Sequence, residues 1–412
     1  MNKRFAVAGM LAVTLASQSV YAKTLEDILK EKGVITEEDY KTVTKSKSFD
    51  YKPGKGFTLT DPDEKFQLSL GGSMQLQYAF TDNEVKPDVS EFRLRRIKTT
   101  FNGYAYTKDL TYKMVLNWAE IGNGTTSGKV MEETFLNYKL ADAAQLMLGQ
   151  DKVQFARQEI TSSGAQQFVD RSFVVDAFKP SYDTGLNLHG DIMKGRIKYD
   201  AGIFGGAGQS TRNLDNMNAL NFRIAVNPFG DMKYSEADLE SSPTPLMSVG
   251  ASYYMNELQK TAADKFDTNA ISYASSNGWL GKNIGIFNAT EKVSIDQLGI
   301  DAAFKWQGLS LQGEYFWARG EGNTSNKDVF AQGFYAQAGY FILPKHLEIA
   351  MRYAWMDPNR DLKNNLTSEI QGAVSYYFFD HNLKLQADMT NHHENKDKSD
   401  NLIGRIQAQL NF

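Results

Sequence analysis

The sequence predicts an all-β fold, a 16-stranded antiparallel transmembrane β-barrel, and three observations predict it. The chain begins with an export signal, no second long apolar run follows, and stretches from Phe66 to the terminal Phe412 alternate apolar with polar side chains. A strand of a membrane barrel has this period of two because one face meets lipid and the other lines the lumen. We therefore expect the protein in the bacterial outer membrane.

Residues 1–22 carry Lys3 and Arg4, an apolar stretch from Phe5 to Ala16, and Ala22 at the end of a small-residue site. This order is typical of a secretory signal peptide, and we expect cleavage after Ala22. The apolar stretch is too short for a transmembrane anchor, which needs about 20 residues. The mature protein is therefore expected to be exported without a helical membrane span.

The composition excludes several classes of protein. The chain has no cysteine, which excludes a disulfide-stapled scaffold, a cysteine-ligated metal site and a redox-active thiol. It has 45 Lys and Arg against 49 Asp and Glu, a net charge of -4. Nucleic acid selects strongly basic surfaces, so we expect no nucleic-acid partner.

Residues 23–60 show a helical pattern and then a linker. Two short helices are expected from apolar residues at helical spacing, a glycine break and an N-cap pair: Leu25, Ile28 and Leu29, then Gly33, then Thr36 with Asp39. We expect residues 23–60 to form a periplasmic helical segment with its linker, and residues 61–412 to form the barrel domain. The apolar stripe could mediate trimer contacts or dock on the barrel floor, and an inert helical hairpin is the alternative.

The first barrel strand shows the alternation most clearly. In the segment 66–80, Leu68 and Leu76 share one face, and Gln67 and Gln75 share the other. This segment is much longer than the mean globular strand of about 5 to 6 residues. The same pattern predicts sixteen strands near 66–80, 91–106, 110–121, 131–140, 144–151, 184–193, 195–205, 219–228, 246–256, 293–306, 308–319, 329–342, 346–356, 367–379, 382–393 and 401–412.

The connections between these strands alternate in length. An even number of strands matches bacterial barrels, and sixteen leave an aqueous channel. Tight connections are expected on the periplasmic side, and the outer connections include 152–183, 206–218 and 257–292. The connection 229–245 is too long for a periplasmic turn, so it is either an undetected feature or a periplasmic loop.

The segment 91–106 is the most basic strand. Phe92 and Leu94 fit the lipid face, and the later apolar residues from Ile97 onward fit it only if a bulge shifts the parity near Arg95–Arg96. Four cationic side chains then face the lumen: Arg93, Arg95, Arg96 and Lys98. Guanidinium groups suit phosphate or carboxylate oxygens, so this wall would attract anions. The alternative is a basic wall that orients the field across the lumen without specific selectivity.

Two stretches carry a resemblance to a known family. One is FRLRRIK at residues 92–98, and the other is GQDKVQFARQEITSS at 149–163, followed by FVDRSFVVDAF at 168–178. Here the sequence resembles the phosphate-selective porin O/P family of bacterial outer-membrane anion porins. The resemblance implies a homotrimer of 16-stranded barrels whose third outer loop, 152–183, folds into the lumen as the constriction. In that loop the candidate basic groups are Lys152, Arg157 and Arg171, and the opposing acidic groups are Glu159, Asp170 and Asp176.

We therefore expect an outer-membrane porin with a water-filled, anion-preferring diffusion channel for phosphate or other small anions. Its expected partners are outer-membrane lipid, small anions and two further copies of the chain. Acidic residues at lumenal positions count against strict phosphate selectivity: Glu133, Asp200, Asp301, Glu314, Glu348 and Asp388. The alternative is a non-conducting or weakly selective barrel that serves as receptor, adhesin or part of a larger complex.

An enzyme is not expected. The histidine pair His392–His393 has no H-E-x-x-H spacing, and the sequence contains neither a G-x-S-x-G elbow nor a P-loop. An outer-membrane hydrolase remains a third, more remote hypothesis. We expect no catalytic residues, no metal and no cofactor.

Overall fold

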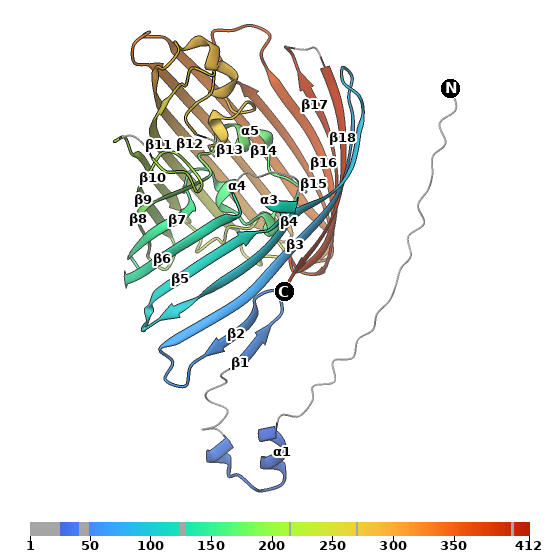
Figure 1. Ribbon diagram of the computed structural model, residues 1–412. Helices are drawn as coiled ribbons and strands as arrows, with labels where there is room; N and C mark the ends of the chain where they lie inside the picture. Colours follow the sequence, from blue (N-terminus) through green and yellow to red (C-terminus); the bar gives the residue numbers. More distant parts are fainter. Residues whose placement is uncertain (1–24, 41–48, 123–128, 214–215, 269–270, 397–398) are drawn as a thin grey trace, which may run out of the picture. The chain divides into compact units, whose positions relative to one another are not determined.

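A computed structural model describes residues 25–40, 49–122, 129–213, 216–268, 271–396 and 399–412 (Figure 1). The chain divides into two units, Met1–Ser48 and Phe49–Phe412. The expected signal peptide, residues 1–22, lies outside the described residues. Within the described ranges, no helix combines the length and the apolar character needed to cross a bilayer.

The first unit contains α1 (Leu25–Glu31) and a second helical turn at residues 37–40. Gly33, with a φ of +67°, lies between them. Thr36 and Asp39 form a reciprocal cap: the Asp39 amide donates to Thr36 Oγ1 and the Thr36 amide donates to Asp39 Oδ2, each over 3.1 Å. This cap satisfies two amide donors that the helix itself leaves unpaired.

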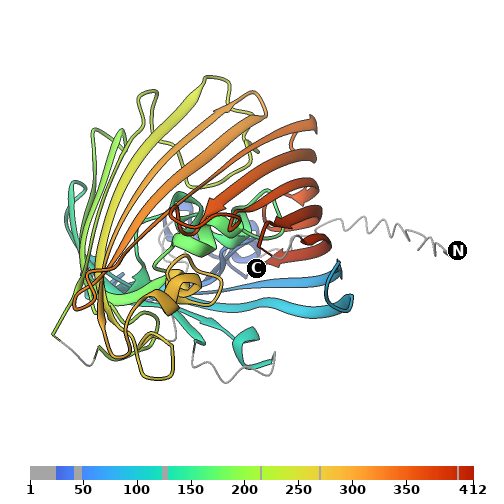
Figure 2. The same ribbon diagram turned by 90° about the horizontal axis from the view of Figure 1, so that it is seen from above.

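The second unit is one antiparallel sheet whose last sixteen strands close into a barrel, which confirms the predicted fold class (Figures 1 and 2). Closure occurs where β18 pairs with β3, from Asn411↔Ser73 to Leu402↔Asp82. The sixteen strands are β3 (Phe66–Asp82), β4 (Val89–Ala105), β5 (Thr107–Asn117), β6 (Met131–Ala141), β7 (Ala144–Lys152), β8 (Tyr182–Ile192), β9 (Ile197–Phe204), β10 (Ala219–Val226), β11 (Leu246–Gln259), β12 (Lys292–Trp306), β13 (Leu309–Gly322), β14 (Asp328–Leu343), β15 (Leu347–Asp357), β16 (Thr367–Phe379), β17 (Leu383–Glu394) and β18 (Ser399–Asn411).

The barrel wall carries its apolar side chains on the outside. On β13, Leu311 and Tyr315 are 42% and 39% exposed, whereas Gln312 and Glu314 are 7% and 4% exposed. A water-soluble sandwich would show the reverse, because its apolar faces would be buried. The exposed apolar face therefore meets lipid, as the alternation predicted.

A hairpin extends the sheet where the sequence pattern predicted a linker. β1 (Phe49–Lys52) pairs with β2 (Gly56–Thr60), and β2 pairs with the start of β3. Because β18 reaches β3 only from Ser73 onward, the first residues of β3 have a free edge, which β2 covers. Residues 49–60 thus belong with the barrel, and the interpretation of the whole 23–60 range as helices and linker was wrong for this part.

The expected tight connections are confirmed, and several rest on residues with positive φ, such as Tyr106, Met193, Gln307 and Asp380. On the other side, β5 is followed by the short helix α3 (Ala119–Gly122). The connection between β7 and β8, residues 153–181, folds into the barrel and is called the inward loop from here on. Figure 2 shows its green helices inside the ring of strands.

The inward loop contains α4 (Arg157–Ile160), a 3₁₀ turn η1 (Ser163–Ala165) and α5 (Phe173–Phe178). On the lumenal side of β11 to β15 it packs against the β11–β12 connection, which carries the 3₁₀ turns η2 (Ser272–Ala274) and η3 (Gly281–Ile286). Phe178 stacks on Phe316 of β13 with ring centroids 5.4 Å apart, and Trp279 is fully buried beside them. This apolar core fills part of the barrel from within.

Candidate functional site

Lumenal carboxylates of the wall hold the inward loop. The first two amides of α4, those of Arg157 and Gln158, donate to Glu314 over 2.6 and 2.7 Å. Glu314 also accepts from the Tyr335 hydroxyl at 2.8 Å. A helix leaves its first amides without partners, and this carboxylate supplies partners for two of them.

Two further acidic residues of the wall also accept hydrogen bonds from the inward loop. Gln167 Nε2 donates to Glu348 at 2.6 Å, and the Val169 amide donates to Asp388 at 3.0 Å. From the sequence alone, these acids were expected to face the water of the lumen and to weaken phosphate selectivity. In the structure their carboxylates are buried and accept hydrogen bonds from the inward loop.

Four guanidinium groups converge on Asp170 of the inward loop. Arg95 donates through Nε to Asp170 Oδ1 at 3.0 Å, with Nη2 2.9 Å from the same oxygen. The nearest nitrogens of Arg93, Arg96 and Arg405 lie 3.7, 3.8 and 3.5 Å from its carboxylate oxygens. Arg93, Arg95, Arg96 and Arg405 are called the arginine cluster below. Three of its members were predicted, and the structure brings these three together.

The predicted bulge on β4 is confirmed. Gln75 of β3 pairs with Arg96 and Leu76 pairs with Leu94, which leaves Arg95 as the extra residue. A bulge re-aims side chains, and here it lets two consecutive arginines contact the same lumenal carboxylate.

A second bulge lies on β6. Val115 pairs with Glu133 and Leu116 with Met131, so Glu132 is extra. Lys98, the fourth predicted cation of β4, forms an ion pair with Glu132. One bulge therefore places two consecutive arginines on β4, Arg95 and Arg96, and the other places two consecutive glutamates on β6, Glu132 and Glu133.

The arginine cluster is partly open to the lumen. The side chains of Arg93 and Arg95 are 33% exposed, against 9% for Arg96 and 13% for Asp170. Arg93 also pairs with Glu91 on its own strand, with nitrogen and oxygen 3.2 Å apart. Burial alone would raise the pKa of the Asp170 carboxyl, but Arg95, Arg96 and Arg405 outweigh it and hold that pKa well below its usual range. Asp170 is thus a resident anion of the cluster.

The other predicted basic residues lie inside the packing of the loop. Lys152 Nζ donates to the Glu159 carbonyl at 2.8 Å, and Arg171 Nε lies 2.9 Å from Glu159 Oε2. Arg157 is 1% exposed, with Nη1 3.4 Å from Asp301 Oδ1. Burial would raise the pKa of Glu159, but Arg171 and other cations keep it well below its usual range. The structure therefore does not bring these three cations to the arginine cluster.

Sequence reasoning missed two arginines. Arg405 of β18 joins the cluster and also lies 2.7 Å from Asp388. Arg352 of β15 donates to the Asp170 carbonyl at 3.1 Å and stacks over the Phe168 ring at 4.3 Å. The sequence pattern could have indicated Arg405, because it alternates in step with Gln407 on the lumenal face of β18. Closure of the barrel then makes β18 a neighbour of β3.

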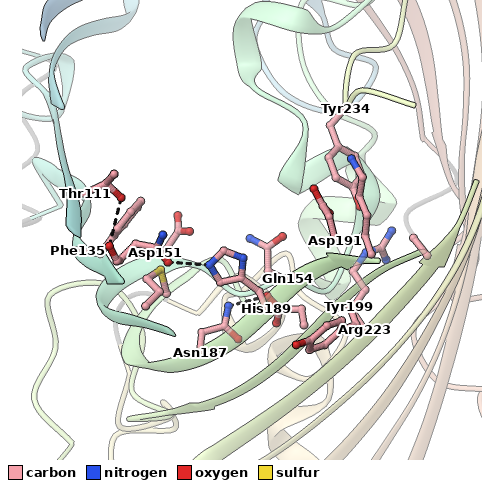
Figure 3. A pocket seen from close by; sticks show the side chains of 16 residues that line it. Thr111, Phe135, Asp151, Gln154, Asn187, His189, Asp191, Tyr199, Arg223 and Tyr234 are labelled. Atoms are coloured by element: carbon pink, nitrogen blue, oxygen red, sulfur yellow. Dashed lines mark hydrogen bonds between the residues drawn. The ribbon is translucent and has the colours of Figure 1, made fainter. Parts of the chain in front are cut away.

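A lumenal cavity of about 390 Å³ lies against the wall from β5 to β10 (Figure 3). Its lining mixes acidic, basic and aromatic groups, including Asp151, Asp200, Lys198, His189 and Tyr234. Within the described residues, no cluster of potential ligands suits a metal ion. The cavity therefore offers both charged and apolar surface on the lumenal side of these strands.

The sequence model of phosphate-selective porin O and P matches residues 68–412. The chain belongs to this porin family. Membership and the closed barrel make the protein an outer-membrane porin channel. An uncharacterised protein of Aquifex aeolicus (strain VF5) is 23% identical to this porin over 451 aligned positions, which cover all of both chains.

Solved structures share the fold of this porin. An anion-selective porin from Comamonas acidovorans has a TM-score of 0.59 at 10% identity, over 84% of this chain and 100% of its own. The outer-membrane channel DcaP of Acinetobacter baumannii has a TM-score of 0.55 at 12% identity, over 87% and 100%. A trimer form of OmpT of Vibrio cholerae has a TM-score of 0.53 at 10% identity, over 84% and 99%.

Proposed function

We propose that this porin forms an anion-preferring diffusion channel for phosphate or other small anions. The observation that carries the proposal is the arginine cluster, in which four guanidinium groups contact one carboxylate, that of Asp170, and two remain one-third exposed. A guanidinium group at a pore wall offers a partly dehydrated anion a forked donor. The anion-selective porin of similar fold adds support for this class of solute.

Within this proposal, Arg93, Arg95 and Arg96 face the passing anion, and Lys98 and Arg405 add positive charge beside them. The role of Lys152, Arg157 and Arg171 as anion ligands stays a prediction, and their buried contacts favour a role in holding the inward loop. The wall acids Glu314, Glu348 and Asp388 are buried against the inward loop, so they count less against an anion preference than the acidic composition suggests. The absence of enzymatic activity also stays a prediction.

We also propose that the porin assembles as a homotrimer in the outer membrane. The trimer form of OmpT, which shares the fold, supports this assembly. Chemical crosslinking in intact outer membranes tests it, and a single monomer band at every crosslinker concentration would contradict it.

Bilayer recordings of the Arg93→Gln, Arg95→Gln double variant test the anion preference. The anion-over-cation permeability ratio should fall about five- to thirty-fold, since each of the two unit charges removed is worth roughly 0.5–1 kcal/mol at ~4–8 Å from an ion in water. Arg319→Gln is the matched control, because Arg319 is also 33% exposed but pairs with Asp328 at the outer end of β13. An unchanged reversal potential in the double variant would overturn the proposal. Addition of inorganic phosphate to a chloride current then shows whether phosphate competes.

A second candidate is a barrel that does not conduct. The apolar core formed by the inward loop and the β11–β12 connection favours it, because this core removes part of the lumen. Single-channel recording of the wild-type protein decides between the two, since only an open channel gives resolved current steps.

A further inference from the structure

The connection between β10 and β11, residues 227–245, enters the barrel instead of forming a periplasmic turn. Its buried side chains include Met232, Glu236, Asp238 and Ser242. The sequence left open whether this stretch was a periplasmic loop or an undetected feature, and the structure makes it an inward-folded element. From here on it is called the β10–β11 connection.

Glu236 joins the β10–β11 connection to the inward loop. Its amide donates to the Ala165 carbonyl at 3.0 Å. Its Oε1 accepts from Gln158 Nε2 at 2.7 Å, and its Oε2 accepts from the Gln167 amide at 2.8 Å. The side chain of Glu236 thus bridges two points of the loop, one in α4 and one just beyond η1. Glu236 itself is 2% exposed.

The β10–β11 connection is in turn fixed to the barrel wall. Lys305 Nζ of β12 donates to Ser235 Oγ at 2.6 Å and to the Ala237 carbonyl at 2.9 Å. The Gly308 amide, in the turn after β12, donates to Asp238 Oδ2 at 2.8 Å. These contacts fix the residues on both sides of Glu236 to the barrel wall, so the backbone that carries the Glu236 carboxylate is held in place.

We infer that the β10–β11 connection sets the position of the inward loop in the lumen, and that Glu236 is the positioning residue. Through Gln158 and Gln167 it controls where the loop presents Asp170 to the arginine cluster. The same connection contributes Tyr234 to the lining of the lumenal cavity (Figure 3). The Tyr234 ring also lies over the guanidinium of Arg157, 5.0 Å from the ring centroid. The inference deepens the proposed function, and its electrical readout rests on a conducting channel.

The substitution Glu236→Gln tests the contact with a small change. Both carboxylate oxygens accept from N–H donors, so a glutamine amide group must face one of these donors and loses that hydrogen bond. The double variant Glu236→Gln, Gln158→Glu exchanges amide and carboxylate across the same contact and restores a donor–acceptor pair. The matched control is Glu240→Gln, because Glu240 lies on the same connection but is 75% exposed and pairs with Lys233.

A thiol reporter measures the position of the loop without any current. The chain has no cysteine, so Val169→Cys introduces a single thiol at a loop position that is 1% exposed. In this background Glu236→Gln should accelerate labelling by a small neutral thiol reagent about ten-fold or more, as loss of a hydrogen bond to a charged group predicts. Glu240→Gln should leave the rate unchanged, and the exchange variant should return it toward the parent rate.

Equal labelling rates in the parent and in Glu236→Gln would overturn the inference, and so would equal acceleration by Glu240→Gln or failure of the exchange variant to restore the rate. In bilayers, Glu236→Gln should increase open-channel current noise while Glu240→Gln does not. A wild-type protein that gives no current would defeat the proposed function, whereas the labelling result would still decide the role of Glu236.

Discussion

Asp170 Oδ1 lies 2.9 Å from Nη2 of Arg95, and this pair joins the inward loop to the bulged position of β4. The loop therefore places a fixed negative charge within the group of cations that a passing anion would meet. In the proposed anion channel, selectivity depends on the balance between this carboxylate and the arginines around it. On this proposal the charge of the loop matters to a passing anion as well as the charge of the wall.

The first prediction concerns the charge of Asp170. Asp170→Asn should raise the anion-over-cation permeability ratio about two- to five-fold, because the arginine cluster loses its shared counter-charge. Reversal potentials under a salt gradient measure this ratio. Asp176→Asn is the control, since Asp176 belongs to the same loop but is 54% exposed and pairs with Lys179. A lower ratio in Asp170→Asn than in the wild type would show that Asp170 does not attenuate selectivity.

The second prediction is that this effect persists in acid. The pKa of Asp170 lies well below the ordinary 3.8, since the arginines outweigh the effect of burial. A lowered pKa means that Asp170 stays ionised at pH 3.8, and that its stabilising contribution is present above the unfolded pKa and is lost only as pH falls through the lower folded pKa. The difference in reversal potential between wild type and Asp170→Asn should therefore be the same at pH 7 and pH 4. Loss of that difference at pH 4 would contradict the assignment.

A third prediction concerns the packing of the barrel wall. Gly149 of β7 has a φ of +139°, and a Cβ there would lie 2.3 Å from the Thr134 carbonyl oxygen. Gly149→Ala should lower the free energy of unfolding by about 1–3 kcal/mol, because backbone cannot move aside easily. Urea unfolding from lipid vesicles, followed by tryptophan fluorescence, measures the change. Gly404→Ala should be nearly neutral, since a Cβ there meets nothing within 4 Å.

A fourth prediction tests the lipid-facing surface. Ile300, in the middle of β12, is 46% exposed. Ile300→Lys should cost roughly 2–4 kcal/mol of unfolding free energy, the range for a lysine near the midplane of a bilayer. Ala289→Lys, in the outer connection before β12, should cost far less. Equal stability of the two variants in vesicles would mean that Ile300 does not contact hydrocarbon.

The barrel was predictable from the sequence because its signal is local. Each strand shows its lipid and lumenal faces in consecutive residues, so all sixteen strands could be located, and even the bulge at Arg95 appeared as a break in parity. The β1–β2 hairpin was missed although Phe49 and Tyr51 alternate with polar residues before a proline–glycine turn. Such short strands become recognisable only beside the free edge of β3.

The contacts inside the barrel were not predictable in the same way. Glu314, Glu348 and Asp388 look like ordinary lumenal charges in the sequence, and their partners on the inward loop lie more than 150 residues away in the chain. Arg405 reaches Asp170 only because the last strand closes on the first. Hydrogen bonds and ion pairs between residues far apart in the chain decide which charged side chains stay exposed to the lumen. The pattern of a single sequence does not reveal these contacts.

The two bulges have a consequence for how such a pore can change. An inserted residue at Arg95 or Glu132 adds a charged group to the water-filled side while the hydrocarbon-facing residues on both sides of it keep their places. Gain or loss of one residue within a strand can therefore retune which ions pass without altering how the protein sits among lipids.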